Sequence, residues 1–297
     1  MSNKIAFLGG DMRQHIAAVS FVEKSWDVYE WGQSGSCNKD GITASDDIYS
    51  AILNSHVVVL PLPATVDGTN LNCNEHVNSS AVKLTDIVDN IESNSLLLGG
   101  KIPEYLCEYA EIRNIKCVDY FKSETFQIKN AYTTAEAALF VAMEKLNKNI
   151  RGSKFAITGY GRIAKQLAIL LMSLGGYVTV CARRDSDLTW AELCGADTIH
   201  IGPDLKLSLS TVTHGYDVVF NTVPSVIFDF DFLAHMDKNT LIIELASSPG
   251  GIDVSAAKQL HSNVLWAASL PGKYAPISAG ELIAECISTL LEREVLA

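Results

Sequence analysis

The sequence lacks the charge pattern of a protein that binds nucleic acid or a membrane surface. It contains 23 Lys and Arg against 34 Asp and Glu, which gives a net charge of −11, and its longest basic run is Arg183–Arg184. Binding to a phosphate backbone requires clustered positive charge. We therefore expect neither nucleic acid nor a membrane as a partner.

Long hydrophobic runs are also missing. The two longest, residues 56–64 and 167–176, are far shorter than the ~20 residues that a transmembrane helix needs. Residues 1–12 contain an apolar run that is too short for the core of a secretory signal peptide. We therefore expect a cytoplasmic protein.

Cysteine and histidine are too scattered to indicate a metal site. The seven Cys are odd in number and widely spaced, which predicts neither a disulfide framework nor a zinc site. Cys117 and Cys181 lie in apolar runs, where a buried, inert thiol is favoured over a nucleophile. The seven His show no ligand spacing, and no hydrolase elbow, HExxH motif or P-loop lysine occurs. No metal-binding residue is predicted.

The sequence does contain a regular alternation of short apolar runs and amphipathic segments over 297 residues, about twice the ~150 residues of a typical domain. Uninterrupted apolar strands are typical of parallel sheets covered on both faces. The expected strands are residues 4–8, 27–31, 56–61, 95–99, 115–119, 154–158, 177–181, 217–221, 240–245 and 263–267. The expected helices are residues 12–24, 103–113, 131–147, 162–174, 188–194, 255–259 and 278–291.

This pattern predicts an α/β protein with two Rossmann-like, doubly wound parallel-sheet domains joined by long crossing helices. The first domain is expected over residues 1–130, a connecting helix over 131–151 and the second domain over 152–277, with a last helix at 278–297 returning to the first domain. Thr133 or Thr134 is the expected N-cap of the connecting helix, which places Glu136 in its first turn.

The strongest local signal is a glycine loop. Gly159, Gly161 and Ala164 form G-x-G-x-x-A directly after an expected strand and directly before an expected helix. In this context the first glycine allows a tight turn, the second lets the backbone approach a pyrophosphate, and the helix start offers unpaired N–H groups to the phosphates. The loop therefore predicts dinucleotide binding, against the simpler alternative of a tight α/β turn.

The end of the next expected strand favours NADP over NAD. NAD sites usually place an acidic residue there to hold the ribose 2′-hydroxyl, whereas this chain has Arg183 and Arg184. A guanidinium can pair with a 2′-phosphate, although either arginine could instead be a solvated charge that contacts an NAD ribose. The residues expected to contact the cofactor are Gly159, Tyr160, Gly161, Arg162, Ile163, Arg183, Arg184, Asn221, Thr222, Val223, Pro224, Ser247 and Pro271.

The first domain has a weaker glycine loop. Gly9 and Gly10 follow a strand, but the third small residue of a dinucleotide fingerprint is absent. A small anion held by N–H groups and by Arg13 is the more plausible ligand; alternatively, Arg13 is a surface charge.

Seven blocks in order carry a resemblance to a known family: IAFLGGDMRQ, VVLPLPAT, AYTTAEAAL, ITGYGRIAKQLA, VFNTVPSVIF, ELASSPGGID and LPGKYAPISAGELIA. Together they cover most of the chain and resemble the dipicolinate synthase A-subunit family. The resemblance implies NADP-dependent oxidation of a dihydropyridine dicarboxylate to dipicolinate in the mother cell of a sporulating bacterium, and it implies a separate B subunit. A homo-oligomer is also expected.

The implied substrate is a small dicarboxylate, which needs cationic or N–H partners. The candidate substrate-binding residues are Asp11, Arg13, Gln14, Thr65, Thr133 and Thr134, which include the expected helix starts at Asp11 and Thr133. Lys273 is a further cation. Glu136 is a candidate proton acceptor, and its alternative role is that of a capping-box acid. Glu136 and Lys273 are thus the candidate catalytic residues.

Two other functions remain open. One is an amino-acid or 2-hydroxyacid dehydrogenase on the same scaffold, against which we count the expected absence of a His/Glu or His/Asp pair at a strand end. The other is a non-catalytic NADP-binding scaffold whose partner subunit performs the chemistry.

Overall fold

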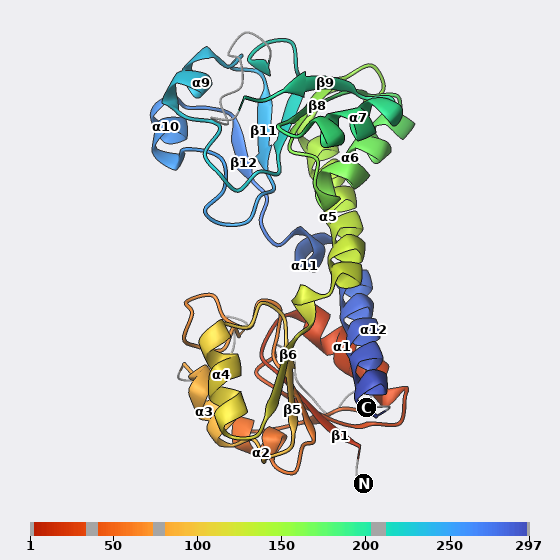
Figure 1. Ribbon diagram of the computed structural model, residues 1–297, viewed down its shortest axis with the longest axis vertical. Coiled ribbons are helices and arrows are strands. Elements are labelled where there is room, and N and C mark those ends of the chain that lie inside the picture. The colour runs from red at the N-terminus through yellow and green to blue at the C-terminus, as the bar shows by residue number, and fades with distance from the viewer. Residues whose placement is uncertain (1–2, 34–40, 74–80, 203–211, 296–297) are drawn as a thin grey trace. The chain divides into compact units, whose positions relative to one another are not determined.

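The structure is a computed structural model that describes residues 3–33, 41–73, 81–202 and 212–295. The chain divides into two compact units. Unit 1 comprises Met1–Asn130 together with Ala275–Ala297, and unit 2 comprises Ala131–Tyr274. Figure 1 labels the helices and strands of both units.

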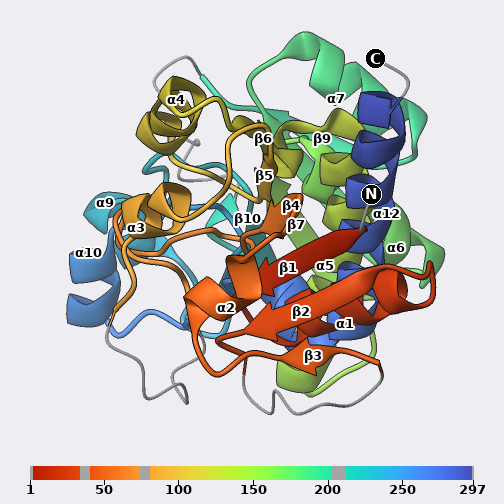
Figure 2. The same ribbon diagram turned by 90° about the horizontal axis from the view of Figure 1, so that it is seen from below.

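Unit 1 is a parallel sheet with helices on both faces. Its strands are β1 (Lys4–Leu8), β2 (Asp27–Trp31), β3 (Thr43–Ala44), β4 (Val57–Val59), β5 (Leu96–Gly99) and β6 (Lys116–Asp119). Its helices are α1 (Met12–Val22), α2 (Ile48–Ile52), α3 (Leu84–Asp89), α4 (Glu104–Ile112), the 3-10 helix η1 (Tyr120–Lys122), the start of α5 (Glu124–Lys145), and α12 (Pro276–Val295). Helices α2, α3 and α4 lie on one face of the sheet, and α1 and α12 lie on the other (Figures 1 and 2).

Strand β1 shows why this unit needs helices on both sides. All five of its residues are buried, and successive side chains of a strand point to opposite faces. Ile5 and Phe7 pack in the core under α1 and α12, whereas Ala6 and Leu8 pack in the core under α2, α3 and α4. A strand that is apolar on both faces is stable only when both faces are covered.

Unit 2 repeats this architecture. Its strands are β7 (Lys154–Thr158), β8 (Tyr177–Ala182), β9 (Asp197–His200), β10 (Val218–Asn221), β11 (Leu241–Glu244) and β12 (Val264–Trp266). Its helices are the rest of α5, α6 (Arg162–Ser173), α7 (Asp185–Leu193), α9 (Phe230–His235), α10 (Val254–Gln259) and α11 (Leu270–Tyr274). One core lies under α5, α6 and α7, and the other lies under α9 and α10.

The two sheets have the same topology. Their strand orders are β3-β2-β1-β4-β5-β6 and β12-β11-β10-β7-β8-β9, and every pairing is parallel. Both consist of two three-strand halves that run outward from a central pair of strands, which is the arrangement of a doubly wound Rossmann sheet. The predicted fold class is confirmed.

In such a sheet the chain reverses direction at the central pair, and ligands bind beyond the carboxyl ends of the strands at this point. The structure therefore has two switch points, one between β1 and β4 and the other between β7 and β10.

The expected start of the connecting helix is wrong. Helix α5 begins at Glu124, so Thr133 and Thr134 lie inside it and neither is an N-cap. The start is set instead by Ser123, whose hydroxyl accepts a hydrogen bond from the backbone N–H of Phe126 (3.4 Å). A serine before an acidic first turn is a common helix start.

Two short edge strands, β3 and β9, were not predicted from the sequence. Both contain exposed or half-buried residues, so neither has the apolar run that marks the inner strands.

The close packing of α1 against α12 depends on Gly280. A Cβ at this position would lie 2.6 Å from the Cβ of Ile16 and 2.7 Å from the backbone oxygen of Arg13. These distances are shorter than a van der Waals contact, so the helices approach each other only because Gly280 has no side chain.

We expect Gly280→Ala to lower the free energy of unfolding by about 1–3 kcal/mol, because the added methyl group forces the two helices apart. Urea denaturation followed by circular dichroism measures this change. The control is Glu281→Ala, which removes an exposed side chain of the same helix. Equal stability of the two variants would show that α1 and α12 adjust without cost.

Candidate functional site

The switch point of unit 2 carries the glycine loop. Gly159 follows β7 with a φ of +84°, and its N–H donates to the backbone oxygen of Cys181 (2.8 Å). A Cβ at Gly159 would lie 2.7 Å from Oγ1 of Thr222. Both the positive φ and the close contact require glycine here, so the tight turn has the geometry that the fingerprint predicts.

At Gly161, unlike at Gly159, the fold itself does not require a glycine. It precedes α6 with a φ of −80°, and an added Cβ would meet no atom within 4 Å. The protein itself therefore leaves room for a side chain at this exposed position. Among the described residues no side chain caps α6, and a helix start of this kind is suited to bind an anion.

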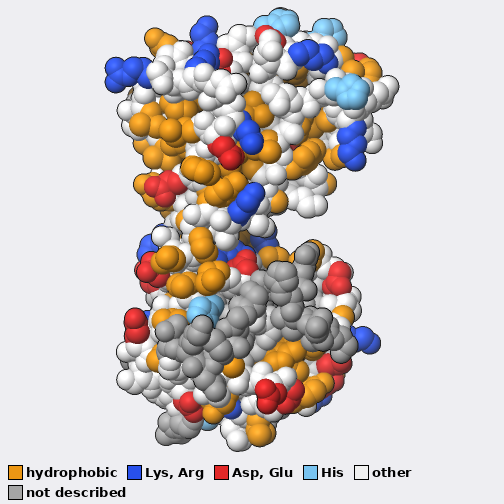
Figure 3. All heavy atoms as spheres, turned by 180° about the vertical axis from the view of Figure 1, so that it is seen from behind, with side chains coloured by type: hydrophobic (Ala, Val, Ile, Leu, Met, Phe, Trp, Pro, Cys, Tyr) orange, Lys and Arg blue, Asp and Glu red, His pale blue; other side chains and the backbone are white. Residues whose placement is uncertain are grey.

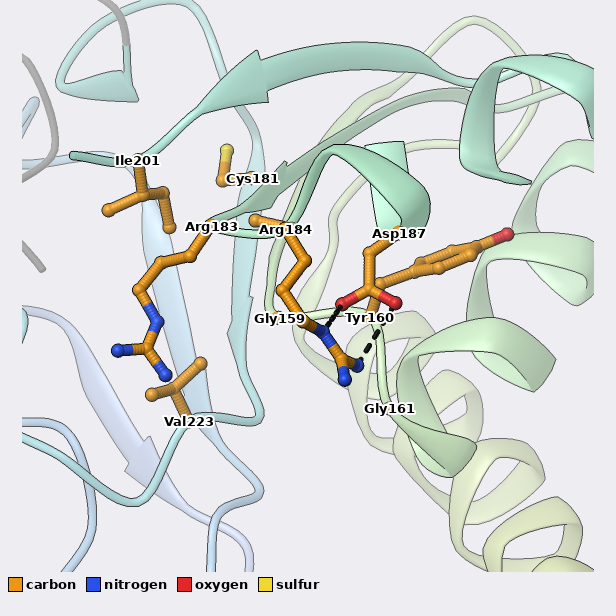
Figure 4. Close-up of a pocket in the computed structure, with 10 residues that line it drawn as sticks. Gly159, Tyr160, Gly161, Cys181, Arg183, Arg184, Asp187, Ile201 and Val223 are labelled. Carbon is orange, nitrogen blue, oxygen red and sulfur yellow. Dashed lines mark hydrogen bonds and ion pairs between the residues drawn. The ribbon is translucent and has the colours of Figure 1, made fainter. Parts of the chain in front are cut away.

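A pocket of about 230 Å³ opens beside this loop. It is lined by Gly159, Tyr160, Gly161, Cys181, Ala182, Arg183, Arg184, Asp187, Ile201 and Val223. Six of the predicted cofactor residues thus border one cavity (Figure 4). It combines an uncapped helix start with two arginines at the end of β8.

The two arginines have different surroundings. Arg184 is paired with Asp187, with Nε at 2.8 Å from Oδ2 and Nη2 at 3.1 Å from Oδ1. The side chain of Arg183 extends between Ile201 and Val223 (Figure 4) and makes no hydrogen bond or ion pair with any residue that the structure describes. Of the two arginines in the described lining of this pocket, Arg183 is therefore the one available to a ligand.

Tyr160 cannot act as a base in this pocket. Its ring is buried, and burial together with a hydrogen bond to Cys194 raises its pKa to about 12. In Figure 4 the ring points away from Arg183.

The other predicted cofactor residues have varied environments. Arg162 and Ile163 form the first turn of α6. Pro224 and Ser247 are exposed in the loops after β10 and β11. Asn221 is fully buried, and Pro271 is buried in α11.

Glu244, at the end of β11, is a buried carboxylate that sequence analysis missed. It accepts hydrogen bonds from Nδ2 of Asn221 (2.8 and 2.9 Å), the N–H of Ala246 (2.8 Å) and the N–H of Gly251 (2.9 Å). Burial raises the pKa of Glu244, and these donors oppose that shift. No periodicity or motif marks it, because it looks like the last residue of a buried strand.

The switch point of unit 1 is filled by its own chain. The N–H of Gly10 donates to the backbone oxygen of Asn72 (2.8 Å), and a Cβ at Gly9 would lie 2.6 Å from that same oxygen. The start of α1 is capped by Asp11, whose Oδ1 accepts from the N–H of Arg13 (3.0 Å). A carboxylate of the protein therefore occupies the helix start at which a free anion was expected.

Arg13 is buried, with 9% of its surface exposed, so the alternative of a surface charge is wrong. Its Nε and Nη2 pair with the Asp11 carboxylate at 2.8–3.1 Å, and Nη2 also donates to the backbone oxygen of Leu62 (2.7 Å). Its Nη1 makes no hydrogen bond with a described residue. Arg13 thus links the loops after β1 and β4, and its Nη1 is a donor that no described residue uses.

Two other predicted substrate residues lie in unit 1. Gln14 is buried and donates to the backbone oxygen of Val59 (2.9 Å), while its Oε1 has no partner among the described residues. Thr65 is half-buried, and its hydroxyl bonds Asp67 (3.0 Å) and the N–H of Gly68 (3.0 Å) within its own loop.

Unit 1 also contains a histidine–carboxylate pair, so its expected absence is wrong. Nδ1 of His15, on α1, lies 3.0 and 3.1 Å from the two carboxylate oxygens of Glu30, on β2. Glu30 is buried, which raises its pKa, and His15 opposes this shift. The two residues are separated in sequence, and only the packing of α1 on the sheet brings them together.

The remaining predicted residues belong to unit 2. Thr133 and Thr134 are buried within α5, and Glu136 is exposed on the same helix. Because α5 begins at Glu124, Glu136 is not a capping-box acid and Thr133 offers no free helix start. Lys273 is exposed on α11, with Nζ 5.0 Å from the centre of the Tyr274 ring.

The described residues hold no group of three or more His, Cys, Asp or Glu that could bind a metal ion. Cys37 lies outside the described residues. No helix within the described ranges is long and apolar enough to cross a membrane.

Comparisons with known proteins agree on one family. The sequence model of the N-terminal domain of the dipicolinate synthase A subunit matches residues 4–121. The dipicolinate synthase A subunit of Bacillus subtilis (strain 168) is 30% identical over 297 residues, which cover 97% of this chain and 95% of that protein.

Solved structures show the same fold. The dipicolinate synthase A subunit from Bacillus halodurans matches with a TM-score of 0.82 and 24% identity, covering 97% of each chain. A transhydrogenase from Sinorhizobium meliloti matches with a TM-score of 0.65 and 14% identity, over 98% of this chain and 94% of that one. With 30% identity to a relative over nearly its full length, the chain belongs to the dipicolinate synthase A-subunit family.

Proposed function

We propose that this chain is the NADP-dependent oxidoreductase subunit of a dipicolinate synthase, which oxidises dihydrodipicolinate to dipicolinate during spore formation. Family membership supports the substrate, and the dehydrogenase-like fold supports the reaction type. The observation that carries the proposal is the open glycine loop of unit 2 with Arg183 beside it, which has no partner among the residues that the structure describes.

The residues of this pocket fit a phosphorylated dinucleotide. The space above Gly161 is open, where a Cβ would obstruct a pyrophosphate, and no described side chain caps the start of α6. Arg183 pairs with no described residue and so can bind a 2′-phosphate, while the acid Asp187 is occupied by Arg184. When bound, NADP would supply the hydride acceptor.

The chain's own residues have the tasks of binding, orientation and proton removal. Conversion of the dihydropyridine ring to the aromatic ring releases one hydride and one proton, so the enzyme needs an aligned substrate and a proton acceptor. We assign a substrate carboxylate to Arg13, whose guanidinium is held rigidly by Asp11 and by the Leu62 carbonyl. Glu136 remains the proposed proton acceptor, and Lys273 the proposed second cation.

We also propose that the protein assembles with a B subunit, together with further copies of itself. The family is named for one component of a synthase, which supports the first partner. Exposed apolar side chains support association more generally, and Figure 3 shows many of them across one face of unit 2. Phe140 and Met143 on α5 and Ile169 on α6 are each about half exposed.

The purified chain should oxidise dihydrodipicolinate with NADP, and Arg13→Met should lower turnover by one to three orders of magnitude. The reason is that a substrate carboxylate loses its guanidinium partner, which costs ~2–4 kcal/mol. Absorbance of the reduced nicotinamide measures the rate. NADP affinity should not change, because Arg13 belongs to unit 1.

Arg113→Met is the matched control for this variant, since it removes an arginine of the same unit that pairs with Asp89 at the surface. Normal kinetics of Arg13→Met would show that the Arg13–Asp11 pair is structural. A wild-type chain that binds NADP but has no activity without the B subunit would favour the scaffold alternative. Turnover of amino acids or 2-hydroxyacids would favour the other dehydrogenase function.

Gly161→Val should abolish dinucleotide binding while the fold stays intact, because the added side chain enters only the space expected for the pyrophosphate. Calorimetry measures binding and circular dichroism measures the fold. Gly159→Val should instead lower stability as well, since its φ is +84° and Thr222 is in the way. Retained binding in Gly161→Val would mean that the loop is only a turn.

Arg183→Ala should weaken NADP binding by about 10- to 100-fold, corresponding to ~1.5–3 kcal/mol for a hydrogen bond to a charged group, and leave NAD binding nearly unchanged. Arg184→Ala is the matched control and should have a smaller effect, because Arg184 is already paired with Asp187. Equal affinity of the wild-type protein for NADP and NAD would contradict this assignment.

A further inference from the structure

The loops after β10 and β11 are joined by a buried hydrogen-bond network. Oγ1 of Thr158 donates to Oδ1 of Asn221 (2.5 Å), and the Asn221 amide nitrogen donates to both oxygens of Glu244. Glu244 in turn accepts from the N–H groups of Ala246 and Gly251. The network therefore reaches from the residue before the glycine loop to both ends of the loop after β11.

Asn221 fixes the loop after β10 by further bonds. Its Oδ1 accepts from the N–H of Val223 (3.2 Å), and its Nδ2 donates to the backbone oxygen of Val223 (3.0 Å). Thr222 closes the same corner, because its hydroxyl donates to the backbone oxygen of Thr158 (2.7 Å). Three strand ends at one switch point thus share one set of bonds.

The network has little room for change. Asn221 is fully buried and Glu244 is 4% exposed. A Cβ at Gly251 would overlap the Asn221 amide nitrogen and lie 2.6 Å from the backbone oxygen of Val223. A side chain at Gly251 would therefore push the two loops apart.

Glu244 has no cation beside it among the described residues and is held by neutral donors alone. A buried carboxylate without a counterion is costly to fold. An Asn or Gln in its place could not serve all the donors, because an amide has only one acceptor oxygen. A carboxylate has two acceptor oxygens, and Glu244 uses both of them to accept from its three donor groups.

We infer that Glu244 is a positioning residue that sets the loops after β10 and β11 at the spacing required by the half of the dinucleotide distant from Arg183. This inference rests on the proposed function. In the sheet, β8 with Arg183 lies on one side of β7, and β10 and β11 lie on the other. A dinucleotide bound across the switch point extends over both sides. Its adenosine half would lie on the β8 side, so the loops after β10 and β11 would contact the other half.

The test compares Glu244→Gln and Gly251→Ala with the control Glu192→Gln. Glu192 is an exposed residue of α7 in the same unit, and its carboxylate accepts from Thr198 (2.6 Å). Hydrogen exchange without ligand, followed by mass spectrometry, should be faster in peptides covering residues 221–225 and 245–252 for both test variants. Glu192→Gln should leave these peptides unchanged.

Ligand affinity supplies a readout that general loss of structure would not reproduce. In the test variants NADP affinity should fall about tenfold or more, because the two loops would have to be ordered when the ligand binds. Affinity for adenosine 2′,5′-bisphosphate should stay within about twofold, because it needs only the β8 side of the site.

The outcomes separate this inference from the proposed function. Unchanged exchange in Gly251→Ala or in a folded Glu244→Gln overturns the role of Glu244, as does faster exchange with unchanged NADP affinity. Equal loss of affinity for both ligands also overturns it. Failure of the wild-type chain to bind either NADP or NAD overturns the proposed function, whatever the exchange shows.

Discussion

The start of the helix after each unit's first strand needs a partner for its free N–H groups, and the two units meet this need differently. In unit 1 the Asp11 carboxylate caps α1, and Asn72 lies against the glycines. In the described part of unit 2 no side chain caps α6, and the space beside Gly161 is open. Two sheets of one topology therefore have one switch point closed by the chain and one with an open helix start, the kind of position at which proteins bind phosphates.

A ligand could reach the start of α6 at the open switch point only if the neighbouring loops stay apart, so the proposed role of this site requires a rigid frame. Gly159 holds the turn with a positive φ, and Thr222 closes over it by bonding Thr158. Glu244 then ties the next loop to the same corner. The polar side chains that brace this frame are mostly buried and, apart from Glu244, uncharged.

Much of the fold and part of the site were predictable from the sequence because their signals are local. The inner strands are apolar on both faces, and the glycine loop follows a strand directly. Strands β3 and β9 are short and partly exposed, so no apolar run marks them. The start of α5 was missed because its signal is Ser123, upstream of the expected segment. Asn221 with Glu244, and His15 with Glu30, are pairs that only the folded sheet brings together.

The two units also treat buried charge in different ways, and this difference bears on their proposed roles. Unit 2 surrounds Glu244 with neutral donors, which fixes loops without adding a cation that would attract a competing anion. Unit 1 pairs Arg13 with Asp11 and leaves Nη1 without a partner among the described residues. A carboxylate ligand at Nη1 would meet a guanidinium that is already desolvated and oriented, so little ordering cost remains to be met on binding. Because Asp11 partly neutralises Arg13, a ligand with one carboxylate would gain little binding free energy at this guanidinium. A substrate with two carboxylates would bind more tightly, because its second carboxylate can bind a different group.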